Sequence, residues 1–436
     1  MIRRVHIKGY KSLRDVEIGL HPLTVISGPN AAGKSNLLDA LGLLSRMVTK
    51  RSLKEAFEEH RGLPLEAFTI DTSLDDLIAR GHAEFEITAD VELSPSVIRE
   101  TEELVRKMRE GLPASPSPPS AKRLVLEKYL RYGVRIRVMT DSGLLAVVEE
   151  RLCAINRHGD EKLSRNPFID TRDNRVRVRM ERQGHPVYHD VGLDHTIAST
   201  PLYAPHHPHI AAFKEEISRW RFYYLEPKSM REESALKVAE TLGPYGTDLA
   251  AFYNTLKTRQ PRQFDALNRT LRAVLPAVKA VDVERTAMGV LRLNVAENGT
   301  VYSAGVISEG TLRVLGLLAI TSALTPLTVV GYEEPENGVH PRRLKLIADL
   351  FTNAASLGNR QYIINTHSPV LPEFFPPEDL VMCTRENGST RFSQYELGPL
   401  FVRSEVDRVL AQGEPEEAEA SAAFGEKLIR GDFGGS

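Results

Sequence analysis

The sequence predicts an α/β protein in which a phosphate-binding loop joins a strand to a helix. An apolar, β-prone run, LTVIS at residues 23–27, ends at Gly28, and the leucines beyond the loop recur at helical spacing. Between them lies GPNAAGKS, residues 28–35, which matches the G-x-x-x-x-G-K-S/T pattern in full. Two more apolar segments, LTVVGYEEPENGVHP at 327–341 and RQYIINTHSPVL at 360–371, change to polar residues midway, as strands of an open α/β sheet do where ligands bind.

Composition narrows the classes of protein that this chain can be. Of its 436 residues, 42% are hydrophobic and 26% are charged, which is ordinary for a globular protein and excludes disorder of the whole chain. The net charge of -2 excludes a polybasic DNA-coating protein. Two cysteines cannot build a disulfide framework and suit a reducing compartment. With no apolar signal region at the N-terminus and no long uncharged run, we expect a cytoplasmic protein without a membrane partner.

The organisation along the chain suggests two lobes with an insertion between them. We expect an N-terminal lobe with the phosphate loop at residues 1–94 and a C-terminal lobe at residues 201–400. Residues 95–200 are predicted to form an inserted arm or lid, which contains a Pro/Ser-rich linker at 112–122. Residues 401–436 form an acidic, Gly-rich tail that we expect to be partly solvated.

Four shorter segments carry local predictions. Residues 96–110 resemble a charged amphipathic helix, and residues 281–299 suggest two strands joined by a turn. Residues 171–182 alternate basic and apolar side chains, which predicts an exposed strand, with a nucleic-acid-binding strand as the alternative. The three histidines of YAPHHPHI, 203–210, have no acidic or cysteine partner nearby in sequence, so we expect a surface loop rather than a metal site.

The residue types of the phosphate loop suit nucleotide chemistry. Its glycines let backbone N–H groups turn toward phosphate oxygens, and the following helix adds the positive end of its dipole. Lys34 would place a charge on the β- and γ-phosphates, and the Ser35 hydroxyl would be a ligand for Mg²⁺. We therefore predict that the chain binds ATP with Mg²⁺. The predicted nucleotide-binding residues of the loop are Gly28, Pro29, Asn30, Ala31, Ala32, Gly33, Lys34, Ser35 and Asn36.

Acidic and histidine residues at the ends of the two later strands supply the predicted catalytic groups. Glu333 would orient Mg²⁺, and Glu334 would polarise the attacking water. Pro335 ends the strand and holds both carboxylates at its carboxyl edge. His367 could reach the γ-phosphate as a hydrogen-bond donor. We expect Glu336 to have a structural role.

A Ser-Glu-Gly-Thr segment begins an apolar helix before the acidic strand. Ser308 is a good helix N-cap, and the N-terminal amides of this helix are suited to an anion. A plain capped core helix is the alternative interpretation. The position of the segment, one helix before the acidic strand, favours a role at the nucleotide.

In their order along the chain, the phosphate loop, the Ser-Glu-Gly-Thr segment, the acidic strand end and the histidine resemble the ABC-type ATPase heads of the SMC, RecF and overcoming-lysogenization-defect groups. The chain looks like the stand-alone bacterial AAA family ATPases that carry GPNAAGKS, SEGT, EEPE and THSP strings. The resemblance covers roughly residues 1–50 and 300–384. It implies a P-loop NTPase fold with an ABC-type head, mixed sheets and an inserted arm or lid.

The resemblance also implies how two copies would cooperate. ABC-type heads form a head-to-tail homodimer that encloses two ATP molecules. Ser308 and the amide of Gly310 would contact the γ-phosphate bound to the partner copy. Residues 338–340 would lie near the partner's active site, and Lys11 or Ser12 would lie near the nucleotide.

The chain departs from the ABC pattern in four respects. Its signature is Ser-Glu-Gly-Thr rather than the Ser-Gly-Gly-Gln of transporters, and Glu333 replaces the usual aspartate. No glutamine occurs between Asn36 and Arg182, so the glutamine that usually links Mg²⁺ to the arm has no assigned position. The insertion also lacks the sustained heptads of a long coiled coil, which favours a short lever or lid.

The sequence therefore predicts an enzyme that hydrolyses ATP, closes as a dimer around it, and moves DNA or a partner protein in DNA repair or phage defence. The alternative is an ATPase subunit or sensor that controls a separate nuclease or toxin effector and binds DNA little. A nuclease on the same chain is disfavoured, because the stretch after His367 is shorter than a Toprim domain of roughly 100 residues. The signature disfavours a transporter ATPase. The presence of both Glu333 and Glu334 disfavours a switch that barely hydrolyses ATP.

Overall fold

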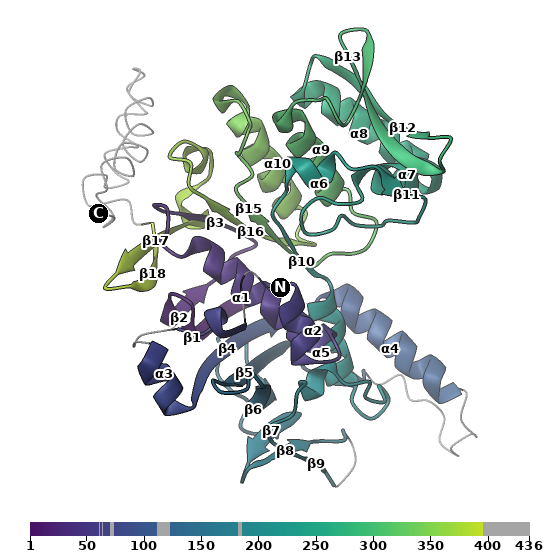
Figure 1. The fold of residues 1–436 in the computed structure, drawn as a ribbon. Helices are drawn as coiled ribbons and strands as arrows, with labels where there is room; N and C mark the ends of the chain where they lie inside the picture. The colour runs from purple at the N-terminus through teal and green to yellow at the C-terminus, as the bar shows by residue number, and fades with distance from the viewer. Residues whose placement is uncertain (61, 63, 70–73, 111–122, 182–184, 396–436) are drawn as a thin grey trace, which may run out of the picture. The chain divides into compact units, whose positions relative to one another are not determined.

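A computed structural model describes residues 1–60, 62, 64–69, 74–110, 123–181 and 185–395. The chain forms two compact units (Figure 1). The first unit contains residues 1–21, 31–220 and 384–392. The second contains residues 22–30 and 221–383, and it resumes at residue 393.

An antiparallel, eight-stranded sheet organises the first unit. In pairing order its strands are β2 (Leu13–Gly19), β1 (Ile2–Tyr10), β4 (His82–Glu92), β5 (Tyr129–Met139), β6 (Leu145–Ala154), β7 (Ile169–Arg172), β8 (Arg175–Val178) and β9 (Val187–Asp190). The β4–β5 register runs without a break from His82 opposite Met139 to Glu92 opposite Tyr129. Strands from the 95–200 segment thus continue the sheet that the N-terminal strands begin.

Side-chain alternation explains why one face of this sheet is core. Along β5, buried Leu130, Tyr132 and Val134 alternate with half-buried Arg131 and Arg135. Successive side chains of a strand point to opposite faces, so the apolar set faces inward and the arginines face outward. The helices of the unit are α1 (Lys34–Thr49), α2 (Leu53–Glu58), η1 (Pro64–Ala67), α3 (Leu74–Arg80), α4 (Pro95–Glu110), η2 (Ile197–Ser199) and α5 (Pro208–Ser218).

A largely parallel sheet organises the second unit. In order, its strands are β10 (Trp220–Tyr223), β15 (Val329–Glu333), β16 (Gln361–Thr366), β3 (Leu23–Ser27) and β17 (Leu380–Glu386). Strands β15, β16, β3 and β17 pair in parallel, and every residue of the first three is buried. Burial on both faces is typical of parallel strands and explains their nearly continuous apolar sequence. After β17 the hairpin to β18 (Ser389–Gln394) passes into the first unit.

Helices and a smaller sheet complete the second unit. A hydrophobic cluster joins Val330 and Ile364 of the parallel sheet to Leu315 on α9, Phe252 on α7 and Val295 on β13. The helices are α6 (Pro227–Met230), α7 (Leu249–Arg259), α8 (Pro261–Val274), α9 (Glu309–Thr321), η3 (Pro341–Arg343), α10 (Leu344–Ser356), η4 (Leu371–Phe374) and η5 (Pro377–Asp379). The smaller sheet contains β11 (Ser234–Ala235), β12 (Val278–Arg285), β13 (Val290–Glu297) and β14 (Thr300–Ser303).

Several local predictions can be compared with the structure. The helix expected at 96–110 is α4, and the two strands expected at 281–299 are β12 and β13. The linker at 112–122 and the tail at 401–436 lie outside the described residues. Within the described ranges, no helix is long and apolar enough to cross a membrane.

The predicted surface loop at the three histidines is wrong for two of them. His207 is buried, and His209 is fully buried near the start of α5. The Nδ1 atom of His209 pairs with Glu181 at 2.6 Å, and its Nε2 accepts two backbone N–H groups. A polar ring can be buried when each of its nitrogens has a partner. In the described part of the chain, no cluster of three or more metal-ligating side chains occurs.

Candidate nucleotide site

Three parallel strands of the second unit end at one edge of their sheet. Glu333 at the end of β15 is in register with Asn365, and Thr366 at the end of β16 is in register with Ser27 at the end of β3. Glu334, His367 and the first residue of the phosphate loop therefore leave the sheet along the same edge. In open α/β sheets this carboxyl edge is where ligands bind.

The structure brings the two predicted catalytic side chains of this edge together. The Nδ1 atom of His367 lies 3.2 Å from Oε1 of Glu334, without the geometry of a hydrogen bond. Glu334 has a left-handed backbone, with φ of 52°, and its N–H donates to the carbonyl oxygen of Asn365 at 3.0 Å. Asn337 donates its side-chain amide to Oε2 of Glu334. A non-glycine residue held in this sparsely populated conformation, with its carboxylate clamped, is common at functional sites.

Glu336 has a different environment from its neighbour Glu334. It is 8% exposed, and its Oε1 accepts hydrogen bonds from three groups at the end of β16. Those donors are the Thr366 hydroxyl at 2.5 Å and the backbone N–H groups of His367 at 3.2 Å and Ser368 at 3.1 Å. Sequence reasoning left this glutamate without a chemical role.

The acid predicted to orient Mg²⁺ is the last residue of β15. Glu333 is buried at the carboxyl edge of the sheet. Mg²⁺ is commonly bound by one or two protein oxygens together with substrate phosphates, rather than by an all-protein cage. The Glu333 carboxylate at this edge and the Ser35 hydroxyl beyond the loop are residue types that such a site uses.

Two glycines of the phosphate loop are required by close packing. A Cβ on Gly28 would lie 2.1 Å from the carbonyl oxygen of Cys383, within the second unit. A Cβ on Gly33 would lie 2.0 Å from Oγ1 of Thr390, within the first unit, and the φ of Gly33 is 106°. Gly33 is also the N-cap of α1, with no side-chain cap, and buried Lys34 is the first residue of that helix. A glycine N-cap brings no side chain of its own to the start of the helix, which suits an anion such as phosphate.

A hydroxyl cluster in the first unit supports the loop. Thr390 on β18 donates its hydroxyl to the carbonyl oxygen of Ala32 at 2.7 Å and lies 2.6 Å from the hydroxyl of Ser12. The side chain of Asn36 donates to the same Ser12 hydroxyl at 2.7 Å. Of these residues, Thr390 escaped the sequence analysis because it is separated from Ser12 by 378 positions along the chain.

Lys11 belongs to a second polar cluster of the first unit. Its ammonium pairs with Asp39 on α1, and the Tyr10 hydroxyl donates to the same carboxylate at 2.7 Å. His60 Nε2 lies 3.3 Å from Asp39 and 2.9 Å from the Tyr10 hydroxyl. Burial raises the pKa of Asp39, but the hydrogen bond with His60 and the charge of Lys11 outweigh it and hold that pKa well below its usual range. Sequence analysis identified Lys11 but missed Asp39 and His60.

The Ser-Glu-Gly-Thr segment forms a capped helix start, as its sequence predicts. The Ser308 hydroxyl accepts the Thr311 N–H at 3.2 Å. A Cβ on Gly310 would lie 2.5 Å from the carbonyl oxygen of Gly338, so this glycine allows close contact with the loop after β15. Within the second unit, the signature segment and the 338–340 segment thus lie against each other.

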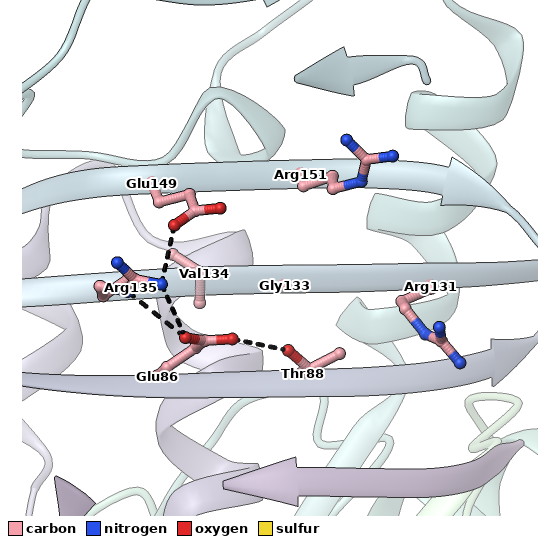
Figure 2. Close-up of a pocket in the computed structure, with 8 residues that line it drawn as sticks. All are labelled: Glu86, Thr88, Arg131, Gly133, Val134, Arg135, Glu149 and Arg151. Carbon is pink, nitrogen blue, oxygen red and sulfur yellow. Dashed lines mark hydrogen bonds and ion pairs between the residues drawn. The ribbon is translucent and has the colours of Figure 1, made fainter. Parts of the chain in front are cut away.

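The outer face of the eight-stranded sheet carries ion pairs rather than an open basic surface. Figure 2 shows Arg135 of β5 between Glu86 of β4 and Glu149 of β6, at 3.1 Å and 2.9 Å. Beside them, Gly133 and Thr88 line a pocket of about 80 Å³. At roughly 30 Å³ per water in the liquid, it has room for a few waters and is too small for a nucleotide.

The basic strand at 171–182 follows the same pattern. It contains β8 and the end of β7, and Asp170 pairs with Arg172 and Arg177 at 3.0 Å and 2.8 Å. Asp170 also accepts from Arg151 at 2.6 Å. Positive charges that carboxylates partly offset attract a phosphate backbone less strongly than unpaired ones.

Comparison with known proteins places the chain in a family. Residues 63–372, more than half of the chain, match the model described as "AAA domain, putative AbiEii toxin, Type IV TA system". The chain belongs to this AAA-domain family. A second model, described as an AAA domain, matches residues 4–78 of this AAA-domain protein.

Similarity to individual proteins is more limited. An OLD nuclease of Thermus scotoductus is 43% identical over 44 residues, which cover 10% of this AAA-domain protein and 8% of that nuclease. Solved SMC heads overlap it loosely. One bound to the C-winged helix domain of ScpA gives a TM-score of 0.46 at 14% identity, covering 92% of this chain and 98% of that one. An SMC head from Thermotoga maritima gives 0.40 at 13% identity, covering 91% and 99%.

Proposed function

We propose that this AAA-domain protein binds Mg²⁺-ATP at the carboxyl edge of its parallel sheet and hydrolyses it there. The pairing of Glu334 with His367 at adjacent strand ends carries this proposal. The start of the phosphate loop leaves the same edge, and Lys34 and Ser35 follow in the sequence. Phosphoryl transfer needs mainly positioning and electrostatic stabilisation, which these residue types supply.

In this proposal each group has one task. Lys34 and the loop amides hold the phosphates, and Ser35 and Glu333 hold Mg²⁺, which neutralises developing charge. Glu334 accepts a proton from the attacking water. His367 donates a hydrogen bond to the γ-phosphate from its place beside Glu334.

We further propose that two copies enclose two ATP molecules head to tail. Ser308 and the Gly310 amide would then contact the γ-phosphate held by the partner copy, as the resemblance to ABC-type heads implies. The capped start of α9 supports this, because its helix dipole favours an anion. Hydrolysis would reopen the dimer and move DNA or a partner protein.

A second candidate differs only in the partner. The ion-paired outer face of the eight-stranded sheet favours an ATPase that controls a separate nuclease or toxin effector and binds DNA little. In the described residues, Arg172 and Arg177 both pair with Asp170, so part of their positive charge is already offset.

One experiment separates the two candidates and tests the function that they share. Steady-state hydrolysis of Mg²⁺-ATP is measured with and without linear double-stranded DNA at low and high salt. Stimulation by DNA that is lost at high salt supports a DNA machine, because phosphate contacts release counterions. A hydrolysis rate that DNA does not change supports an ATPase that controls a protein effector. Absence of hydrolysis in the wild type, at the level of a Lys34→Ala control, overturns the proposal.

A further inference from the structure

We infer that Glu336 is a positioning residue, which holds the His367 loop so that the imidazole meets Glu334. The inference rests on the proposed ATPase function and adds to it a residue that the sequence leaves without a chemical role. It is carried by a buried carboxylate whose hydrogen bonds all go to the loop that bears His367.

The three donors to Glu336 come from consecutive residues. The Thr366 hydroxyl and the backbone N–H groups of His367 and Ser368 all converge on one oxygen, Oε1. The other oxygen, Oε2, is buried and has no hydrogen-bond partner. Hydrogen bonds to a charged acceptor are about twice as strong as neutral ones, so this single oxygen fixes the direction in which the chain leaves β16.

The same loop direction determines where the imidazole lies. Nδ1 of His367 is 3.2 Å from Oε1 of Glu334 and 3.9 Å from Oε1 of Glu336. The ring makes no hydrogen bond through Nδ1 that would fix its orientation. The backbone at 366–368, held by Glu336, therefore sets the position of the ring.

Glu334, the other member of the pair, is held by contacts of its own. Its left-handed backbone is tied to Asn365 on β16, and Asn337 clamps its carboxylate. Glu334, Glu336 and Asn337 lie within one four-residue turn, where the Asn337 N–H donates to the Glu334 carbonyl oxygen at 3.2 Å. One short turn after β15 thus sets both members of the pair, Glu334 directly and His367 through Glu336.

The chain offers a matched pair of variants to test this. Glu336→Gln keeps an acceptor at Oε1 and places its NH₂ where Oε2 makes no hydrogen bond, whereas Glu336→Ala removes the acceptor. Hydrogen–deuterium exchange at the amides of residues 367 and 368 measures directly whether their hydrogen bonds to residue 336 persist. We expect faster exchange in Glu336→Ala and near wild-type protection in Glu336→Gln.

Turnover is the second readout. A misplacement of about 1 Å can cost about 10²-fold in rate, so we expect Glu336→Ala to lower kcat by about 10²-fold with KM for ATP little changed. Its three donors lose their acceptor, so the variant is also less stable, and kcat is measured well below its melting temperature. Glu336→Gln should stay within about tenfold of the wild type, because it loses only the charge assistance. In a double-mutant cycle, Glu336→Ala should cost almost nothing further once His367→Ala is present.

The outcomes that would overturn the inference are distinct. Unchanged exchange and unchanged kcat in Glu336→Ala would show that the glutamate does not hold the loop. Additive effects of Glu336→Ala and His367→Ala on kcat would show that it does not act through His367, although the ATPase proposal would survive. A wild type without turnover would overturn both proposals.

Discussion

His367 and Glu334 lie side by side, with Nδ1 of the imidazole 3.2 Å from Oε1 of the carboxylate, although a strand and a helix separate them in sequence. Their positions follow from the parallel pairing of β15 with β16, which aligns the two strand ends. Both side chains are partly exposed, at 28% for Glu334 and 37% for His367, so a water molecule can reach them. Glu334 as general base, with His367 at 3.2 Å, is an arrangement suited to ATP hydrolysis.

Replacing Glu334 by Gln should stop turnover without removing ATP. We expect kcat to fall by about 10²- to 10⁴-fold, because the general base is lost while the phosphate loop is intact. The ATP-bound protein should then accumulate as a dimer, detectable by light scattering. Unchanged turnover would show that another group is the base.

Thr390 offers a prediction that no motif suggests. Thr390→Val removes the hydroxyl that donates to the Ala32 carbonyl oxygen, whereas Thr390→Ser retains a hydroxyl. Leaving these buried partners unsatisfied should cost about 2 kcal/mol of unfolding free energy and weaken the binding of a fluorescent ATP analogue. Denaturant unfolding and nucleotide titration of the two variants measure this. Equal behaviour of the Val and Ser variants would contradict it.

Asp39 should contribute stability that acid removes. Its pKa lies below the usual 3.8, because His60 and Lys11 outweigh burial, so its contribution is fully present above about pH 4 and is lost as the pH falls further. Removing one partner of a buried pair costs about 3 kcal/mol, so Asp39→Asn should be less stable by that amount at pH 7. In urea unfolding, the gap between wild type and variant should narrow below about pH 4. A difference in unfolding free energy that stays constant in acid would show that Asp39 is not paired with Lys11 and His60.

Glu150 should have the opposite pH dependence. It is fully buried on β6, and burial raises its pKa to about 7, although Tyr132 and the N–H groups of Ile197 and Ala198 donate to it. Since the folded state resists ionisation, the stability that this group contributes is present below pH 4.5 and is lost as the pH rises to about 7. The loss is about 3 kcal/mol at most.

A matched variant isolates the Glu150 effect. Urea unfolding of wild type and Glu150→Gln at intervals between about pH 5 and pH 8 gives the difference in their pH slopes. The wild type should lose more stability than the variant over this range. Parallel slopes would mean that Glu150 is ionised throughout.

Sequence patterns predicted the elements whose signals are local. The phosphate loop, the cap at Ser308 and the helix at 96–110 depend on residues a few positions apart, and they occur where the patterns indicate. The sequence assigned Glu334 and His367 separate roles at the nucleotide, and their contact with each other comes from the parallel pairing of β15 with β16. The signals were strong because motif, periodicity and turn chemistry agree.

The contacts that sequence analysis missed depend on tertiary placement. Thr390 reaches the phosphate loop from a hairpin near the other end of the described chain. His209 was expected in a surface loop because its partner Glu181 lies 28 residues away, yet that partner and two backbone N–H groups allow its burial. No periodicity or spacing marks such pairs, since they form only when the sheet brings distant strands together.

Steady-state hydrolysis of Mg²⁺-ATP by the wild type, Lys34→Ala and Glu334→Gln tests the central claim most directly. We predict turnover by the wild type, loss of both ATP binding and turnover in Lys34→Ala, and loss of turnover with retained binding in Glu334→Gln. Turnover that survives in both variants would contradict an ATP site at this edge of the sheet.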